Sequence, residues 1–157
     1  TRWQGVDYLV VDLPPGTGDA PMSLAQLIPL TGVVVVMTPQ DVARQIANKA
    51  VLMFRTLAES AGRDIPILGV VENMSGFTVP GTGEEIAIFG KGGGERAAAS
   101  LGVPFLGAVP IDPAICESGD AGVPVVAGRP QSRSAEAFRR VAGLVAARVS
   151  TVARARD

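Results

Sequence analysis

Short apolar runs alternate with segments of helical periodicity along the chain. Each run is too short for a helix and does not alternate with polar residues, which is the pattern of parallel strands covered on both faces. The runs span residues 6–11, 32–37, 65–71 and 104–109. We therefore predict an α/β fold, in which a mostly parallel sheet is flanked by helices.

Helical segments follow these runs. Apolar residues recur at spacings of three and four over residues 41–61, which predicts an amphipathic helix that ends at Gly62. The face that we expect to be buried consists of Val42, Ile46, Ala50, Met53, Phe54 and Leu57. Asp112 followed by Pro113 is typical of an N-cap with proline at the first helical position. Residues 135–152 again have helical spacing.

One segment, residues 76–95, interrupts this rhythm with glycines and a proline. Because residues 85–89 partly alternate between polar and apolar, we predict a small hairpin near residues 76–89 that projects from the sheet. The segment directly follows a predicted strand. It therefore belongs to the edge of an open α/β sheet at which ligands bind.

The composition limits the possible functions. The chain has 157 residues, of which 47% are hydrophobic, so it can bury the core of one domain or of part of a larger one. Its 14 Lys and Arg nearly balance its 15 Asp and Glu, which argues against nucleic acids and anionic membranes as partners. The chain contains no histidine, which excludes catalysis or metal ligation by histidine within it.

Two further features concern the compartment. Cys116 is the only cysteine, so the chain cannot form an internal disulfide, which fits a reducing environment. No apolar run reaches the length of a membrane span, and the first residues lack the apolar region of a signal peptide. We expect a cytoplasmic protein.

An aspartate, Asp12, ends the first predicted strand, and the prolines and glycines of residues 14–18 follow it at once. A carboxylate at the carboxyl end of an apolar strand is the Walker B arrangement, which holds Mg²⁺ beside nucleotide phosphates, directly or through a water. Glycines in the next loop let backbone N–H groups approach the γ-phosphate. The alternative is that Asp12 caps the helix beginning near Ala20, for which Asp19 is the better candidate.

The glycine-rich stretch FGKGGGE, residues 89–95, differs from a phosphate-binding P-loop. It lacks the G-x-x-x-x-G-K-[ST] frame, no Ser or Thr follows Lys91, and Glu95 would repel phosphate. We interpret it as a flexible entry to a helix at residues 95–101. The chain therefore shows the magnesium side of a nucleotide site without a phosphate cradle.

Two polar residues at the ends of later predicted strands have two interpretations each. Asn73, in VVENMS, can read a base edge with its amide donor and acceptor, or it can cap a turn. Asp112, in VPIDP, has the same ambiguity, and we favour helix capping.

Six stretches together carry a family resemblance. They are DYLVVDLPPGTGD, TPQDVA, GVVENMSGF, FGKGGGE, LGVPFLGAVPIDP and ESGDAGVPVV, in that order over about residues 6–127. Their order and spacing resemble those of the Mrp family, whose members are similar to MinD and are P-loop ATPases that carry iron–sulfur clusters to apo-proteins. The resemblance implies a P-loop NTPase fold, usually in a homodimer, with ATP and Mg²⁺ as cofactors.

The resemblance also implies roles for residues. Asp12 looks like the Walker B aspartate, which is catalytic and holds Mg²⁺, and residues 14–18 look like switch II, with Gly16 catalytic. Asn73 and the turn from Pro110 to Asp112 resemble contacts on the adenine side. The nucleotide contacts implied in this way are Asp12, Pro15, Gly16, Thr17, Asn73, Pro110 and Asp112.

The chain departs from the family pattern in two places. Members carry a Gly-rich Walker A loop with two lysines and a switch I aspartate upstream of the Walker B strand, so residues 1–157 look like the C-terminal part of a single P-loop NTPase domain. In the hairpin, many members read C-P-x-C-G, whereas Val79 and Thr82 stand at the two cysteine positions here. Thiolates hold iron–sulfur clusters, and neither valine nor threonine can replace them.

Three functional classes stay open. The family role is an ATP-hydrolysing carrier that serves apo iron–sulfur proteins and holds its cluster by other means or transiently; we place it first because the motif set belongs to this family. The second is a MinD-like nucleotide-dependent switch without a cluster, which acts through dimerisation and partner binding. The third is that residues 1–157 alone are an inert half-domain, and we expect no ATP hydrolysis by this stretch alone.

Overall fold

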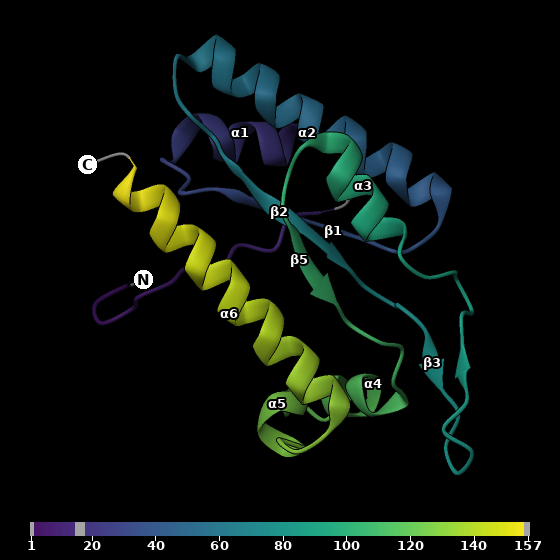
Figure 1. Ribbon diagram of the computed structural model, residues 1–157. Coiled ribbons are helices and arrows are strands. Elements are labelled where there is room, and N and C mark those ends of the chain that lie inside the picture. Colours follow the sequence, from purple (N-terminus) through teal and green to yellow (C-terminus); the bar gives the residue numbers. More distant parts are fainter. Residues whose placement is uncertain (1, 15–17, 156–157) are drawn as a thin grey trace.

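The protein forms a parallel sheet with helices on both faces (Figure 1). The computed structural model describes residues 2–14 and 18–155. Its elements are α1 (Asp19–Leu27), β1 (Val33–Met37), α2 (Asp41–Ala61), β2 (Ile67–Glu72), β3 (Phe77–Thr78), β4 (Glu85–Ile86), α3 (Gly93–Leu101), β5 (Phe105–Ala108), α4 (Pro113–Asp120), α5 (Val125–Gly128) and α6 (Arg133–Arg154). β1, β2 and β5 form a three-stranded parallel sheet in that order, and β3 pairs with β4 in a small antiparallel hairpin. The predicted α/β class and the predicted hairpin are confirmed.

The three parallel strands end together. Met37, the last residue of β1, lies opposite Glu72, the last residue of β2, and Glu72 lies opposite Ala108, the last residue of β5. The turns that leave the strands therefore meet at one edge of the sheet. We define this carboxyl edge by residues 38–40, 73–76 and 109–112. It is the edge at which open α/β sheets bind ligands.

Side chains of the strands face two separate cores. The core between the sheet and helices α2 and α3 consists of Val35, Met37, Ala47, Val51, Val70, Ala97 and Ala98. The core on the other face consists of Val71, Leu106 and Val109, with Val141 and Val145 of α6 packed against it. In Figure 1, α6 crosses one face of the sheet, while α2 and α3 lie on the other. β2 is thus covered on both faces, as its lack of alternation predicts, whereas Val36 of β1 is 61% exposed.

Helix α2 has the predicted bounds but buries a different stripe. It ends at Gly62, whose left-handed φ of 58° suits a residue without a side chain. Its buried residues are Ala47, Val51 and Phe54. Val42 and Ile46, which the sequence predicts to be buried, are 62% and 53% exposed. α1 packs on α2 through Ala25 and Phe54, so the early turns of α2 stay uncovered on that side and the predicted face is wrong there.

The prediction of a strand at residues 6–11 is wrong for the structure described. The segment is irregular, and its apolar side chains are 48% to 87% exposed. Among the described residues, β1 has β2 as its only neighbouring strand, so its outer edge stays open. Extended chain becomes a strand only when a neighbouring strand takes its backbone hydrogen bonds. Leu13, at the end of the segment, packs against Phe54 and Ile65.

The C-terminal helices follow their sequence signals. α4 begins with Pro113 at its first position after the N-cap Asp112, and α6 covers the predicted residues 135–152. Ser132 caps α6, since its Oγ accepts a hydrogen bond from the Ala135 N–H at 3.1 Å. Within residues 2–14 and 18–155, no helix has the length and apolar character that a bilayer span needs.

Candidate functional site

Backbone hydrogen bonds join the three turns of the carboxyl edge. The Asn73 N–H donates to the Met37 carbonyl at 2.8 Å, and the Ile111 N–H donates to the Gly76 carbonyl at 2.8 Å. These bonds satisfy groups that the strands leave unpaired at their ends. They also bring Asn73 and residues 110–112, which lie far apart in the sequence, to the same edge of the sheet.

The side-chain oxygen of Asn73 forms a local hydrogen bond. Its Oδ1 accepts a hydrogen bond from the Met74 N–H at 2.9 Å, and Met74 has a left-handed φ of 58°, which is strained for a residue with a side chain. Among the described contacts, the Asn73 amide nitrogen donates no hydrogen bond, and the side chain is partly exposed. The residue therefore caps a turn and keeps donors that can meet a ligand.

Asp112 is a helix cap. Its Oδ1 accepts from the Ala114 N–H at 2.9 Å, and its Oδ2 accepts from the hydroxyl of Ser134, which is 1% exposed. The favoured capping interpretation is therefore confirmed, and the aspartate also links α4 to α6. Pro110 lies in the same turn and is partly exposed. Contact of this turn with adenine stays a prediction.

Asp12 lies apart from this constellation. It is exposed in the irregular segment and makes no described hydrogen bond or ion pair. It also caps no helix, because α1 begins at Asp19 after Gly18, and no side chain caps α1. The remaining predicted loop residues, which lie outside the described residues, are Pro15, Gly16 and Thr17. The structure thus brings Asn73 and Asp112 to one edge and leaves Asp12 off the sheet.

The chemistry of Asp12 fits Mg²⁺. The ion prefers oxygen ligands and keeps several waters, so one or two carboxylates suffice when nucleotide phosphates supply the other ligands. The single exposed carboxylate of Asp12 matches that donor set. Across the part of the chain that the structure describes, no three His, Cys, Asp or Glu side chains group as metal ligands, so an all-protein cage is absent there.

The hairpin does not fit an iron–sulfur cluster. Val79 is partly buried, and the Thr82 Oγ1 accepts the Glu84 N–H at 3.3 Å within the turn. Cys116 lies on α4, where its Sγ is 3.8 Å from Asp120 Oδ2. Clusters of the common types take four cysteine thiolates, which the described residues do not provide.

Glu72 is a functional candidate that the sequence patterns do not predict. This carboxylate is 1% exposed at the end of β2, and no described ion pair includes it. It accepts hydrogen bonds from the Ser75 hydroxyl, from the Gly92 N–H at 3.1 Å and from the Gly94 N–H at 2.6 Å. The available signal was an acidic residue at the end of an otherwise apolar strand, where only pairing or hydrogen bonding permits a buried charge.

Glu72 explains the glycine-rich stretch. A β-carbon on Gly93 would lie 2.0 Å from the Pro39 carbonyl oxygen, and one on Gly94 would lie 2.8 Å from Glu72 Cβ. Glycine is therefore required for the close approach of this loop to the carboxyl edge. The loop leads into α3, so the interpretation as a helix entry is confirmed.

Two exposed side-chain contacts join the hairpin to neighbouring segments. Lys91 Nζ lies 2.7 Å from Glu85 Oε2, and the Arg133 guanidinium donates to Thr78 Oγ1 at 3.1 Å. The hydrogen bond from Lys91, then its charge, and to a lesser extent the charge of Arg133 lower the pKa of the Glu85 carboxyl below its usual value. Lys91, in the glycine-rich stretch, thus forms an ion pair with the hairpin.

We expect Lys91→Met to raise the pKa of Glu85 toward its usual value, because Lys91 is the main cause of the shift. At pH values above the usual pKa of a carboxyl group, the ion pair stabilises the hairpin. This contribution is lost as the pH falls through the lowered pKa of Glu85. Both groups are exposed, so the change in unfolding free energy is small. Carboxyl carbon NMR titration measures the pKa. Arg140→Met is the control. An unchanged pKa of Glu85 in Lys91→Met would refute Lys91 as the main cause of the shift.

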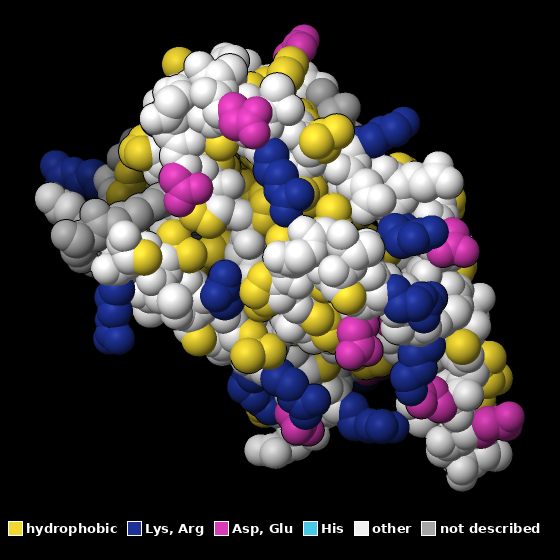
Figure 2. Space-filling model, turned by 45° about the horizontal axis from the view of Figure 1, so that its top comes forward, with side chains coloured by type: hydrophobic (Ala, Val, Ile, Leu, Met, Phe, Trp, Pro, Cys, Tyr) yellow, Lys and Arg dark blue, Asp and Glu magenta, His cyan; other side chains and the backbone are white. Residues whose placement is uncertain are grey.

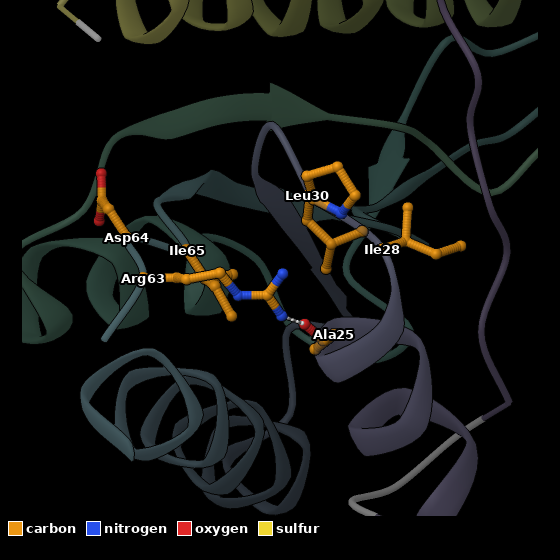
Figure 3. Close-up of a pocket in the computed structure, with 7 residues that line it drawn as sticks. Ala25, Ile28, Leu30, Arg63, Asp64 and Ile65 are labelled. Carbon is orange, nitrogen blue, oxygen red and sulfur yellow. Dashed lines mark hydrogen bonds between the residues drawn. The ribbon is translucent and has the colours of Figure 1, made fainter. Parts of the chain in front are cut away.

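The cavity nearest α1 belongs to the opposite edge of the sheet. It measures about 250 Å³ and is lined mainly by residues that precede β1 and β2: Ala25, Ile28, Pro29, Leu30, Arg63, Asp64 and Ile65 (Figure 3). The Arg63 guanidinium donates to the carbonyls of Ala25 and Gln26, which end α1. Arg63 thus satisfies helix-end carbonyls, and the cavity is remote from the carboxyl edge.

Known proteins resemble the chain over most of its length. An iron-sulfur cluster carrier protein of Aquifex aeolicus is 48% identical over 142 residues, which are 90% of this chain and 37% of the relative. A carrier of the same name from Synechocystis is 43% identical over 97% of this chain and 42% of its own length. An Arabidopsis thaliana iron-sulfur protein required for mitochondrial NADH dehydrogenase is 46% identical over 89% of this chain and 43% of its own. The chain thus spans about two fifths of these relatives.

Solved structures agree with the fold. A nucleotide-binding protein of Archaeoglobus fulgidus in complex with ADP superposes with a TM-score of 0.64 at 38% identity, covering 76% of this chain and 47% of that one. The cell division ATPase MinD of Pyrococcus furiosus gives 0.52 at 27% identity, covering 73% and 42%. The family described as ParA, NUBPL iron-transfer P-loop NTPase, matches residues 1–146. The chain therefore belongs to this family of iron-transfer P-loop NTPases.

Proposed function

We propose that the protein is an ATP-binding and ATP-hydrolysing iron–sulfur cluster carrier. In this proposal the chain supplies the Walker B and switch II elements, Asp12 and residues 14–18, together with the adenine-side elements. The observation that supports it best is the meeting of Asn73 with the turn of residues 110–112 at one edge of a P-loop-type sheet. The iron–sulfur carriers among its relatives and the ADP complex of a structural neighbour agree with this proposal.

Each residue has a distinct part in this proposal. Mg²⁺ bound with ATP supplies positive charge that neutralises the phosphates. Asp12 would hold this ion through a water. By family resemblance, the loop of Pro15, Gly16 and Thr17 would contact the phosphates, with Gly16 as the catalytic residue. The Asn73 amide and the turn from Pro110 to Asp112 bind the adenine side.

In this proposal, the rest of the nucleotide site lies outside residues 1–157. We propose that a Gly-rich, lysine-containing loop follows an apolar strand encoded before residue 1, and that the intact protein is a cytoplasmic homodimer that serves apo iron–sulfur proteins. The open edge of β1 and the uncovered residues 6–11 support the missing strand. The iron–sulfur cluster is cargo in this scheme.

Nucleotide binding by the intact protein tests the proposal. We expect ADP to bind with Mg²⁺, and Asn73→Ala to weaken binding about tenfold, because one or two hydrogen bonds to the base are lost. Isothermal titration calorimetry measures both. Ser100→Ala on α3 is the control, since that hydroxyl bonds only within its own helix. An intact protein that binds no adenine nucleotide would overturn the proposal.

A second candidate is a nucleotide-dependent switch without a cluster. It is favoured by the hairpin, which lacks both thiolates and exposes apolar side chains: Ile86, Ile88 and Phe89 are 44%, 52% and 38% exposed. Figure 2 shows hydrophobic, acidic and basic side chains next to one another on the projecting hairpin. Such a mixed surface suits a protein partner. Iron and sulfide content after anaerobic reconstitution separates the two candidates.

A further inference from the structure

The two segments that connect the hairpin to the rest of the fold both form hydrogen bonds with one buried carboxylate. We call these segments, at Ser75 and at Gly92 to Gly94, the roots of the hairpin. Ser75 lies just before β3, and Gly92 and Gly94 lie shortly after β4. All three donate hydrogen bonds to Glu72, two of them to Oε1 and one, from Gly94, to Oε2 at 2.6 Å. The hairpin is therefore fastened at its entry and at its exit by the same side chain.

The same side chain is continuous with the candidate nucleotide edge. Glu72 directly precedes Asn73, and its carbonyl accepts the Val109 N–H at 2.8 Å, at the start of the turn that carries residues 110–112. On the other side, Gly93 packs against the Pro39 carbonyl in the turn after β1. Glu72 thus lies where all three turns of the carboxyl edge and both roots of the hairpin meet.

The energetics make these contacts cooperative. Glu72 is 1% exposed and has no described basic partner, so its charge depends on the three donors and on the N-terminal end of α3. If one root leaves, the remaining carboxylate is buried with fewer donors, which is costly. Release of one root therefore weakens the hold on the other.

We propose that Glu72 is a positioning residue that couples nucleotide binding at the carboxyl edge to the position of the hairpin. The proposal rests on the proposed function, since it needs a nucleotide at Asn73. A shift of Asn73 or of residues 109–112 on binding moves the end of β2, and the Glu72 carboxylate carries that shift to both roots. The hairpin then responds to the nucleotide state.

Hydrogen exchange of the intact protein, with and without ADP and Mg²⁺, tests the coupling. In the parent we expect ADP to slow exchange across residues 77–94. In Glu72→Gln, whose amide nitrogen faces an N–H donor, we expect the Gly92 and Gly94 amides to exchange at least about tenfold faster. We also expect ADP to lose its effect on residues 77–90 while it still binds.

Two further variants separate coupling from plain destabilisation. Val51→Ala opens a cavity in the core between α2 and the sheet, away from the hairpin, so it lowers the melting temperature and leaves the ADP effect on the hairpin intact. Ser75→Ala removes one root donor and leaves two, so it reduces the ADP effect in part. It also serves as the test if Glu72→Gln does not fold.

The outcomes are distinct. A parent that binds ADP without any change in hairpin exchange overturns the coupling and leaves the proposed function standing. An ADP effect that persists undiminished in Glu72→Gln, or in Ser75→Ala where the first variant fails to fold, also overturns it. A parent that binds no adenine nucleotide refutes the proposed function, and the coupling with it.

Discussion

Asp12→Asn is expected to lower ATP turnover of the intact protein by about a hundredfold or more, the magnitude seen when a charge that stabilises the transition state is lost. Asparagine is nearly isosteric but carries no charge, so it holds the water of a phosphate-bound Mg²⁺ ion weakly. Phosphate release under saturating ATP measures the loss. Nucleotide affinity should change far less, because the contacts that we propose between Asn73 and the adenine side stay in place.

We expect the Asp12→Asn variant to keep the parental fold. Asp12 is exposed and makes no described hydrogen bond or ion pair, so its replacement removes no structural contact within the described residues. Asp7→Asn is the matched control, since Asp7 lies in the same exposed segment. Both variants should melt at the parental temperature, and Asp7→Asn should retain turnover. Parental turnover in Asp12→Asn would show that Asp12 is not the Walker B residue.

The double change Val79→Cys with Thr82→Cys is expected to install a cluster site at the hairpin. The parent supplies no thiolate there, and one Cys116 per protomer gives at most two ligands in a dimer, short of the four that a [4Fe–4S] cluster usually takes. Two hairpin thiolates per protomer would supply four across a dimer. After anaerobic reconstitution we expect the variant to hold about one cluster per dimer more than the parent, whose hairpin binds none.

The hairpin should tolerate these changes. Thr82 makes one local hydrogen bond in an exposed turn, and Val79 keeps its backbone bonds to Glu84 and Gly83 whatever its side chain. Each single cysteine variant is a control and should hold little iron. A stoichiometric cluster in the parent that survives Cys116→Ser would show that other residues of the intact protein hold it, and would contradict the idea that this protein has given up cluster carriage.

Local sequence signals predicted most of the fold. The apolar runs at β1, β2 and β5 form the parallel sheet, and the central strand β2 is covered on both faces, which is what its lack of alternation indicates. Gly62 ends α2, and Asp112 with Pro113 begins α4, since caps act over a few residues. For the same reason, the sequence alone places Asn73 and Asp112 at strand ends. Only the structure shows that they lie at the same edge of the sheet.

The failures all depend on contacts between distant residues. The apolar residues 6–11 read as a strand, but a strand also needs a neighbour, and no strand of the described residues pairs with them. Val42 and Ile46 share the period of the buried face, yet they are 62% and 53% exposed. Glu72 was overlooked because its donors Gly92 and Gly94 follow it by 20 and 22 residues. Periodicity cannot report such pairings.

The open edge of β1 has a practical consequence for the chain in isolation. Its row of unpaired backbone groups, next to Val36 at 61% exposure and to an uncovered apolar segment, is a template on which another molecule can add a strand. Aggregates of the isolated chain would then grow by edge-to-edge pairing. We therefore expect oligomers of residues 1–157 alone to form through this exposed template.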